Sequence, residues 1–125
     1  MARILVIDDE ELVRRTVARM LATGGHQVRE AHDGASGLGL WHRESADLVI
    51  TDIAMPDMTG FELISALRAE GASVPIVAIS GSVVVSDLEV IGRAKALGGV
   101  QLLTKPFSRE QLTAAVASAL LSPTG

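Results

Sequence analysis

The chain has 125 residues, of which 48% are hydrophobic, and it carries a formal net charge of −4 with no cysteine. This length and apolar content predict one folded domain with a hydrophobic core, and they exclude disorder, disulfides and thiolate metal sites. No apolar stretch is long enough to span a bilayer, and the first strand begins too early for a signal peptide, so we expect a cytoplasmic protein with no membrane insertion. Basic residues are not in clustered excess, so we expect no direct nucleic-acid binding.

The first part of the chain predicts two strand–helix pairs. Aliphatic and β-branched residues 3–7 predict a buried strand, and an apolar stripe predicts a helix from about residue 11 to 22. A short strand is expected over 27–31. Asp33 can then cap a helix that reaches residue 41.

The rest of the chain predicts three more strands, over 47–52, 74–80 and 100–104. Each is followed by a capping box, in which a hydroxyl and an acid or amide three residues on satisfy the first amides of a helix. These boxes begin at Thr59, Ser86 and Ser108. Five strands that alternate with helices predict an α/β fold, a doubly wound parallel sheet with helices on both faces. We expect one domain over residues 1–121 and a tail over 122–125.

Charged residues stand at the ends of three predicted strands. Asp8 and Asp9 follow the first strand, Asp52 ends the third, and Lys105 ends the fifth. In an open α/β sheet, ligands bind beyond the carboxyl ends of the strands, where the strand order reverses. Acids at the end of a buried strand are costly unless a cation compensates them, and Mg²⁺ prefers a few carboxylates plus phosphate oxygens. The pattern predicts a Mg²⁺ and phosphate site.

Two neighbouring segments add to this candidate site. The loop after Asp52 contains Pro56 and Gly60, which favour a tight return, and the Ala54 carbonyl in it is a candidate metal ligand. Ser80 ends the fourth strand. It is either an ordinary polar strand end or a hydroxyl donor to a phosphoryl oxygen.

These segments together resemble the response-regulator receiver domain of bacterial two-component signalling, and the chemotaxis regulators in particular. The resemblance covers about residues 3–120. It rests on ILVIDDE at 4–10, DIAMPDMTG at 52–60, SG at 80–81 and LTKPF at 103–107. It implies a flavodoxin-like fold with strand order 2-1-3-4-5.

The resemblance also implies a role for each acid. Asp52 is expected to be the phospho-acceptor in a phosphorelay. Asp9 and Asp52 are expected to bind Mg²⁺ directly, together with the Ala54 carbonyl, and Asp8 mainly through water. A phosphorylated aspartate is a mixed anhydride that water hydrolyses, so a signalling domain with slow self-dephosphorylation is expected rather than a true enzyme.

The remaining family features concern phosphate, partners and output. Ser80 and Lys105 are expected to hold phosphoryl oxygens, and the Lys105–Pro106 peptide bond is expected to be cis. The expected phosphodonor is a sensor histidine kinase or a histidine phosphotransfer protein. The expected output partner binds the face formed by the fourth helix, the fifth strand and the fifth helix.

The sequence departs from the family pattern in two places. Leu102 occupies the position where the family usually has an aromatic switch residue, so the expected movable element is Ser80 with the segment that follows it. That segment, 81–86, is longer than usual and contains three valines at 83–85. The valines are either buried or an apolar partner surface near the output face.

Two further interpretations concern charge and activity. Arg14, Arg15 and Arg19 form a basic face on the first helix, which is either simply solvated or docks an acidic phosphodonor protein. The competing functions are a small Mg²⁺-dependent phosphatase of the aspartyl-phosphate type and a receiver-like docking module. Ala54 disfavours the phosphatase, because such enzymes usually carry an acid two residues after the nucleophile.

Overall fold

The computed structural model describes residues 2–81 and 88–121. Its strands form one parallel sheet in the order β2-β1-β3-β4-β5, as the sequence predicted. The strands are β1 (Arg3–Ile7), β2 (Gln27–Ala31), β3 (Leu48–Asp52), β4 (Ile76–Gly81) and β5 (Val100–Lys105).

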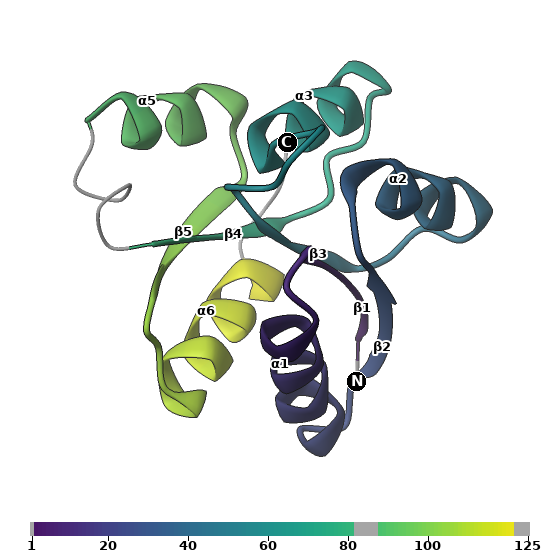
Figure 1. The fold of residues 1–125 in the computed structure, drawn as a ribbon, viewed down its shortest axis with the longest axis vertical. Helices are drawn as coiled ribbons and strands as arrows, with labels where there is room; N and C mark the ends of the chain where they lie inside the picture. The colour runs from purple at the N-terminus through teal and green to yellow at the C-terminus, as the bar shows by residue number, and fades with distance from the viewer. Residues whose placement is uncertain (1, 82–87, 122–125) are drawn as a thin grey trace.

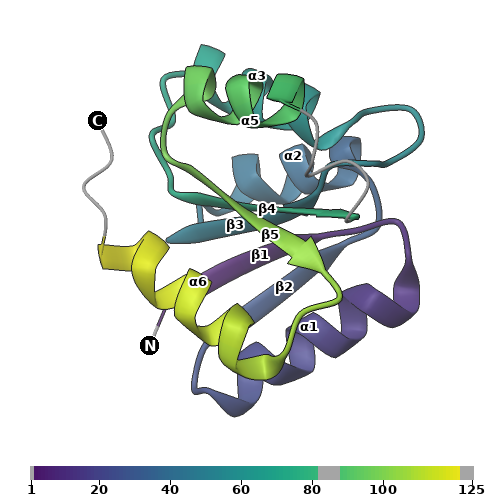
Figure 2. The ribbon, with the colours of Figure 1, turned by 90° about the vertical axis from the view of Figure 1, so that its left-hand side faces the viewer.

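Helices cover both faces of the sheet, which confirms the doubly wound architecture. The helices are α1 (Glu11–Thr23), α2 (Gly34–Arg43), α3 (Gly60–Ala69), α5 (Leu88–Leu97) and α6 (Arg109–Leu121). Helices α1 and α6 lie on one face, and α2, α3 and α5 lie on the other (Figure 1). The same layers are visible when the molecule is turned (Figure 2). Among the described residues, no helix has the length and apolar character that crossing a membrane requires.

The two faces of the sheet carry separate hydrophobic cores, because successive side chains of a strand point to opposite faces. In β1, Leu5 and Ile7 belong to the core under α2, α3 and α5. Ile4 and Val6 belong to the core under α1 and α6. All four side chains are buried. This burial on both faces explains why the strand reads as an unbroken apolar run.

Local capping follows the sequence closely. Thr59 and Glu62 form a reciprocal capping box at the start of α3, and Ser108 forms one with Gln111 at α6. The Asp33 carboxylate accepts the Ser36 amide at 2.7 Å at the start of α2, which runs two residues beyond its predicted end. The predicted box at Ser86, the valines at 83–85 and the predicted tail at 122–125 lie outside the described residues.

The fourth strand begins two residues later than predicted. Pro75 has no N–H to donate to a neighbouring strand, and regular pairing starts at Ile76. At their carboxyl ends, β4 and β5 each extend one residue further than predicted, to Gly81 and Lys105.

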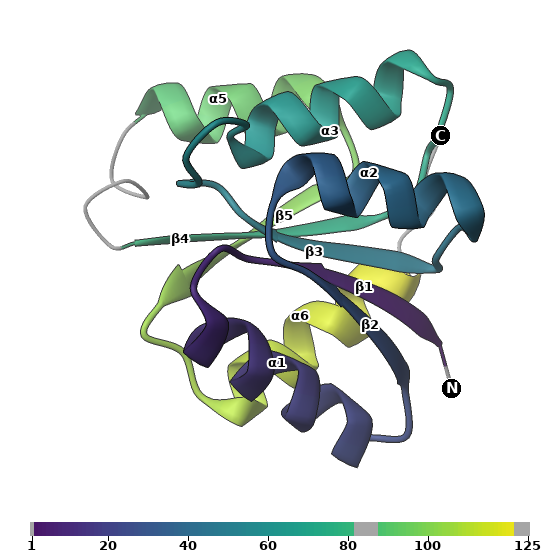
Figure 3. The ribbon, with the colours of Figure 1, turned by 45° about the vertical axis from the view of Figure 1, so that its right-hand side comes forward.

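Strand register brings the predicted site residues to one edge of the sheet. Ile7 of β1 pairs with Thr51 of β3, so the residues that follow, Asp8 and Asp52, are neighbours. In β4 and β5, Ser80 pairs with Thr104, the residue before Lys105. The chain leaves β1 toward β2 on one side and enters β3 on the other, so this edge is where the strand order reverses (Figure 3).

Candidate functional site

A cluster of acids lies at the carboxyl ends of β1 and β3. The Asp8 and Asp52 side chains are buried, with 2% and 3% of the residue exposed. One carboxylate oxygen from each of Asp8, Glu10 and Asp52 lies within 4.8 Å of the others. Carboxylate oxygens at this spacing match the ligands of a hard divalent cation. The cluster therefore has the chemistry to hold a metal ion.

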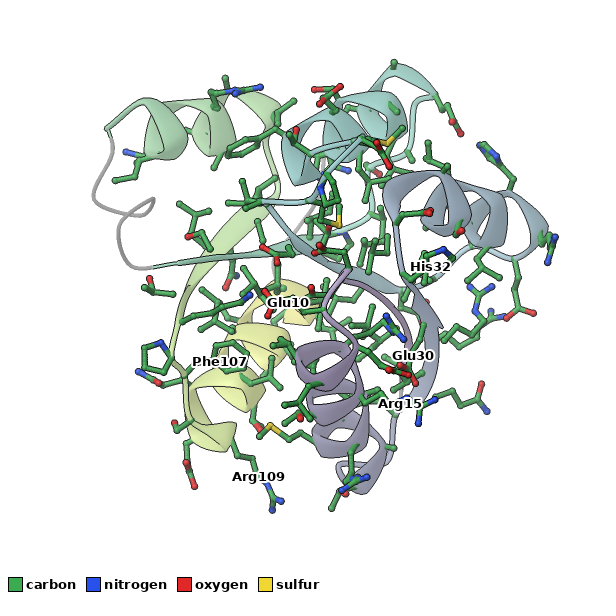
Figure 4. The ribbon with its side chains drawn as sticks, viewed as in Figure 1. Glu10, Arg15, Glu30, His32, Phe107 and Arg109 are labelled. Carbon is green, nitrogen blue, oxygen red and sulfur yellow. The ribbon has the colours of Figure 1, made fainter. Side chains whose placement is uncertain are left out.

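The third acid of this cluster is Glu10, which the sequence analysis did not place in the site. Glu10 is the N-cap of α1 in extended conformation, with no side-chain cap hydrogen bond. Its carboxylate instead lies 3.5 Å from the Lys105 Nζ atom. The signal in the sequence was its place directly after Asp8 and Asp9. Figure 4 shows Glu10 at the start of α1, on the side toward β5.

Asp9, which was predicted to be a direct metal ligand, is not part of the carboxylate cluster. The residue is exposed, whereas Asp8 is buried. This difference follows from chain direction, because Asp8 continues the buried strand and Asp9 lies in the turn that leads into α1.

Asp52 is held from two sides. The Lys105 Nζ atom donates to Asp52 Oδ2 at 3.3 Å, and the Ala54 backbone N–H donates to Oδ1 at 3.2 Å. Partial burial lowers the pKa of Lys105, but the nearby carboxylates of Asp52 and Asp8 outweigh burial and raise that pKa. Lys105 therefore stays charged beside Asp52. The Lys105–Pro106 peptide bond is cis.

Among the acids that the structure describes, Asp8 has the most strongly shifted pKa. Burial raises the pKa of its carboxyl group to about 6, and the charge of Asp52 raises it as well. The Glu10 backbone N–H donates to Asp8 Oδ1 at 2.9 Å and opposes this shift. Two acids pressed together in a buried site favour a proton or a cation between them.

Ser80 and Leu102, both assigned to phosphate or switching, lie in different environments. Ser80 is 1% exposed, and its Oγ atom has no hydrogen-bond partner among the described residues. A buried hydroxyl without a partner is costly, so this atom fits an incoming oxygen ligand. Leu102 is partly buried in β5 and packs against the core under α2, α3 and α5.

The loop after Asp52 is shaped by backbone contacts. Asp57 has a φ of 65°, a conformation that aspartate tolerates better than most residues. Gly60 donates its N–H to the Ile53 carbonyl at 2.9 Å. A Cβ atom at Gly60 would lie 2.4 Å from the Asp52 carbonyl oxygen. The absence of a side chain at Gly60 therefore lets this loop fold back against the end of β3.

The predicted basic face of α1 is smaller than expected. The Arg14 side chain is only 13% exposed and pairs with Glu30 at 3.1 Å. It also donates to the Asp8 carbonyl oxygen at 3.1 Å, so it is not available as a free surface charge. Arg15 and Arg19 are exposed, so the docking hypothesis retains only these two.

Comparison with known sequences agrees with this geometry. A family model for the response regulator receiver domain matches residues 4–117. The probable transcriptional regulatory protein TcrX of Mycobacterium tuberculosis is 33% identical over 98% of the chain, which covers 50% of that protein. The response regulator MprA of Mycobacterium avium is 36% identical over 90% of the chain, which covers 48% of that protein. The chain thus spans about half the length of these relatives.

Comparison with solved structures shows that the fold is also similar to that of receiver domains. The chemotaxis protein CheY4 of Vibrio cholerae superimposes with a TM-score of 0.87 at 31% identity, covering 95% of the chain and 98% of that structure. The receiver domain of NtrX from Brucella abortus superimposes with a TM-score of 0.82 at 30% identity, covering 96% of the chain and 99% of that structure.

Proposed function

Because the chain belongs to the response regulator receiver domain family of two-component systems, we propose that the Asp52 carboxylate accepts a phosphoryl group. The observation that carries this proposal is the position of Asp52. It is a buried acid at the end of β3, with a lysine at 3.3 Å on one oxygen and further carboxylates beside it. A nucleophilic carboxylate needs such positive charge nearby, since an anionic donor would otherwise be repelled.

We propose that Mg²⁺ binds at this cluster. Asp9 and Asp52 are its proposed direct ligands, with the Ala54 carbonyl, and Asp8 acts mainly through water. The clustered carboxylates and the unpartnered Ser80 hydroxyl support a site for a cation and the oxygens that it binds. The Asp9 residue is exposed, so its carboxylate is accessible to an ion.

The proposed reaction is a phosphoryl transfer. An Asp52 oxygen attacks phosphorus, the bond from phosphorus to the donor nitrogen breaks, and an acyl phosphate forms. Lys105 and Ser80 bind the transferred oxygens. Mg²⁺, when bound, supplies charge that offsets the repulsion between the two anions. Water later hydrolyses the mixed anhydride, so self-phosphorylation from small donors and slow self-dephosphorylation are part of the proposal.

Receiver domains interact with histidine kinases and with output domains. We propose that the phosphodonor of this chain is a sensor histidine kinase or a histidine phosphotransfer protein. We further propose that its output partner binds the predicted output face. This face is formed by α5, which is the fourth predicted helix, by β5, and by α6, which is the fifth predicted helix. The cytoplasmic location and the domain limits of 1–121 with a tail at 122–125 stay predictions.

The two alternative functions are less well supported. A phosphatase of the aspartyl-phosphate type would need an acid two residues after Asp52, and Ala54 stands there. A docking module that takes no phosphate would not need Lys105 beside a buried Asp52.

A phosphate-retention gel tests the proposal. The chain is incubated with Mg²⁺ and acetyl phosphate, and wild type is compared with Asp52→Asn and with Asp57→Asn, an exposed acid of the same loop. We expect retardation of wild type and Asp57→Asn but not of Asp52→Asn. Equal retardation of Asp52→Asn would overturn the assignment, and rapid multiple turnover of the donor would favour the phosphatase.

A further inference from the structure

We propose that Arg14 is a positioning residue for the acidic cluster. Its guanidinium group, oriented by Glu30, fixes the main chain of Asp8 and thereby aims the Asp8 carboxylate into the site. This inference rests on the proposed function, because it assumes that Asp8 helps to hold Mg²⁺.

The Arg14 side chain makes two directed contacts. Its Nη1 atom donates to the Asp8 carbonyl oxygen at 3.1 Å, and its Nε atom donates to Glu30 Oε1 at 3.1 Å. Arg14 and Arg15 are adjacent, yet their side chains are 13% and 67% exposed. A planar guanidinium presents several donors in fixed directions, so one group can bridge the end of β1 and the strand β2. In Figure 4, Glu30 lies on the β2 side of α1.

These contacts complete a three-point hold on Asp8. The Asp8 N–H donates to the Ala31 carbonyl at 3.1 Å, and the Glu10 N–H donates to Asp8 Oδ1 at 2.9 Å. The Asp8 carbonyl is the third point, and Arg14 is its donor. With its peptide groups fixed on both sides, the Asp8 side chain has little freedom to leave the cluster.

The action of Arg14 is geometric rather than a charge effect. Glu30 balances the positive charge of Arg14. The guanidinium contacts the Asp8 main chain, whereas the cation that contacts a carboxylate of the cluster is Lys105. A lysine at position 14 would keep the charge but lose the fork of donors, so Arg14→Lys should not restore the function of Arg14.

Calorimetric Mg²⁺ titration tests the proposal, with Arg14→Met as the variant and Arg15→Met as the matched control. We expect Arg14→Met to weaken Mg²⁺ binding about tenfold, as loss of a residue that orients a metal ligand commonly does. Arg14→Lys should show most of that loss, and Arg15→Met should bind like wild type. A merely electrostatic role predicts full recovery in Arg14→Lys.

A double-mutant cycle separates positioning from a general loss of structure. In an Asp8→Asn background, Arg14→Met should cause no further loss of Mg²⁺ affinity, because Arg14 acts through Asp8. The same fold loss in both backgrounds would overturn the proposal, as would equal affinity of Arg14→Met and Arg15→Met.

Amide hydrogen exchange without metal gives an independent readout. We expect faster exchange at the Asp8 amide in Arg14→Met than in Arg15→Met, with unchanged exchange at Ile50 in the centre of β3. Unchanged Asp8 exchange would contradict the proposal. If wild type binds no Mg²⁺, the proposed function fails, whereas the exchange result still decides whether Arg14 holds Asp8.

Discussion

The Lys105 ammonium and the Asp52 carboxylate are 3.3 Å apart, although the two residues are 53 positions apart in the sequence. The two residues end strands β5 and β3, and β4 lies between those strands. The contact therefore depends on the register of the sheet and on the length of the lysine side chain. It places a permanent positive charge where a phosphoryl group on Asp52 would need one.

Replacing Lys105 by glutamine should slow labelling of Asp52 by acetyl phosphate roughly a hundredfold, because one of the groups that stabilise the transferred oxygens is lost. The measurement is the rate of phosphoprotein formation at saturating Mg²⁺. The only other lysine in the sequence, Lys95, is exposed in α5, and Lys95→Gln should label at the wild-type rate. Equal rates for the two variants would remove Lys105 from the site.

The apparent affinity for Mg²⁺ should fall as the pH drops through about 6. At that pH a proton begins to occupy the Asp8 carboxyl group. Burial and the charge of Asp52 raise the pKa of this group to about 6. Between pH 7 and pH 5 the loss should be roughly tenfold, as expected for one competing proton. Calorimetry at several pH values measures it. Asp8→Asn should show little pH dependence in this interval.

The stability of the metal-free protein should have the opposite pH dependence. The pKa of Asp8 is raised in the folded state above its ordinary value of 3.8, so the folded state binds more protons between about pH 4 and pH 6. The free energy of unfolding should therefore fall as the pH rises through this interval. Urea denaturation at several pH values measures this free energy. A free energy of unfolding that rises with pH in wild type but not in Asp8→Asn would contradict the raised pKa.

Asp9 and Glu10 are competing candidates for a ligand of the Mg²⁺ ion. We expect Asp9→Asn to weaken Mg²⁺ binding more than Glu10→Gln. The Asp9 carboxylate is exposed, whereas Glu10 is already engaged with Lys105. Metal titration of the two variants decides between them. A larger effect of Glu10→Gln would mean that the bound ion uses the Asp8, Glu10 and Asp52 cluster directly.

Gly60→Ala should destabilise the fold by about 1–3 kcal/mol and slow the labelling of Asp52. The added Cβ atom would lie 2.4 Å from the Asp52 carbonyl oxygen and 2.8 Å from the Ile53 Cα atom, so the loop after Asp52 must shift. The matched control is Gly39→Ala in α2, where a Cβ atom meets nothing within 4 Å. The control should stabilise the helix by about 0.5–1 kcal/mol. Denaturant unfolding of both variants measures the difference.

The sequence predicted most of the fold because strands such as β1 and β3 are short apolar runs that lead into acids, and helices such as α3 and α6 begin with capping boxes. Both signals are local. The role of Glu10 escaped sequence reasoning, because an acid at the start of a helix is already explained by the helix dipole. The role of Arg14 escaped it too, because its position on the helix places it among exposed residues, and only the packing of α1 against β2 brings Glu30 within reach.

Mapping the phosphorylated residue by mass spectrometry tests the central claim most directly. After labelling with acetyl phosphate and Mg²⁺, cleavage after arginine yields one peptide over residues 4–14, with Asp8 and Asp9, and another over 44–68, with Asp52. Borohydride reduction of the acyl phosphate before cleavage marks the modified aspartate permanently. We predict the mark in the second peptide alone, at Asp52 and not at Asp47 or Asp57. A mark at Asp8 or Asp9, or at another acid of the second peptide, would contradict the assignment of Asp52 as the phospho-acceptor.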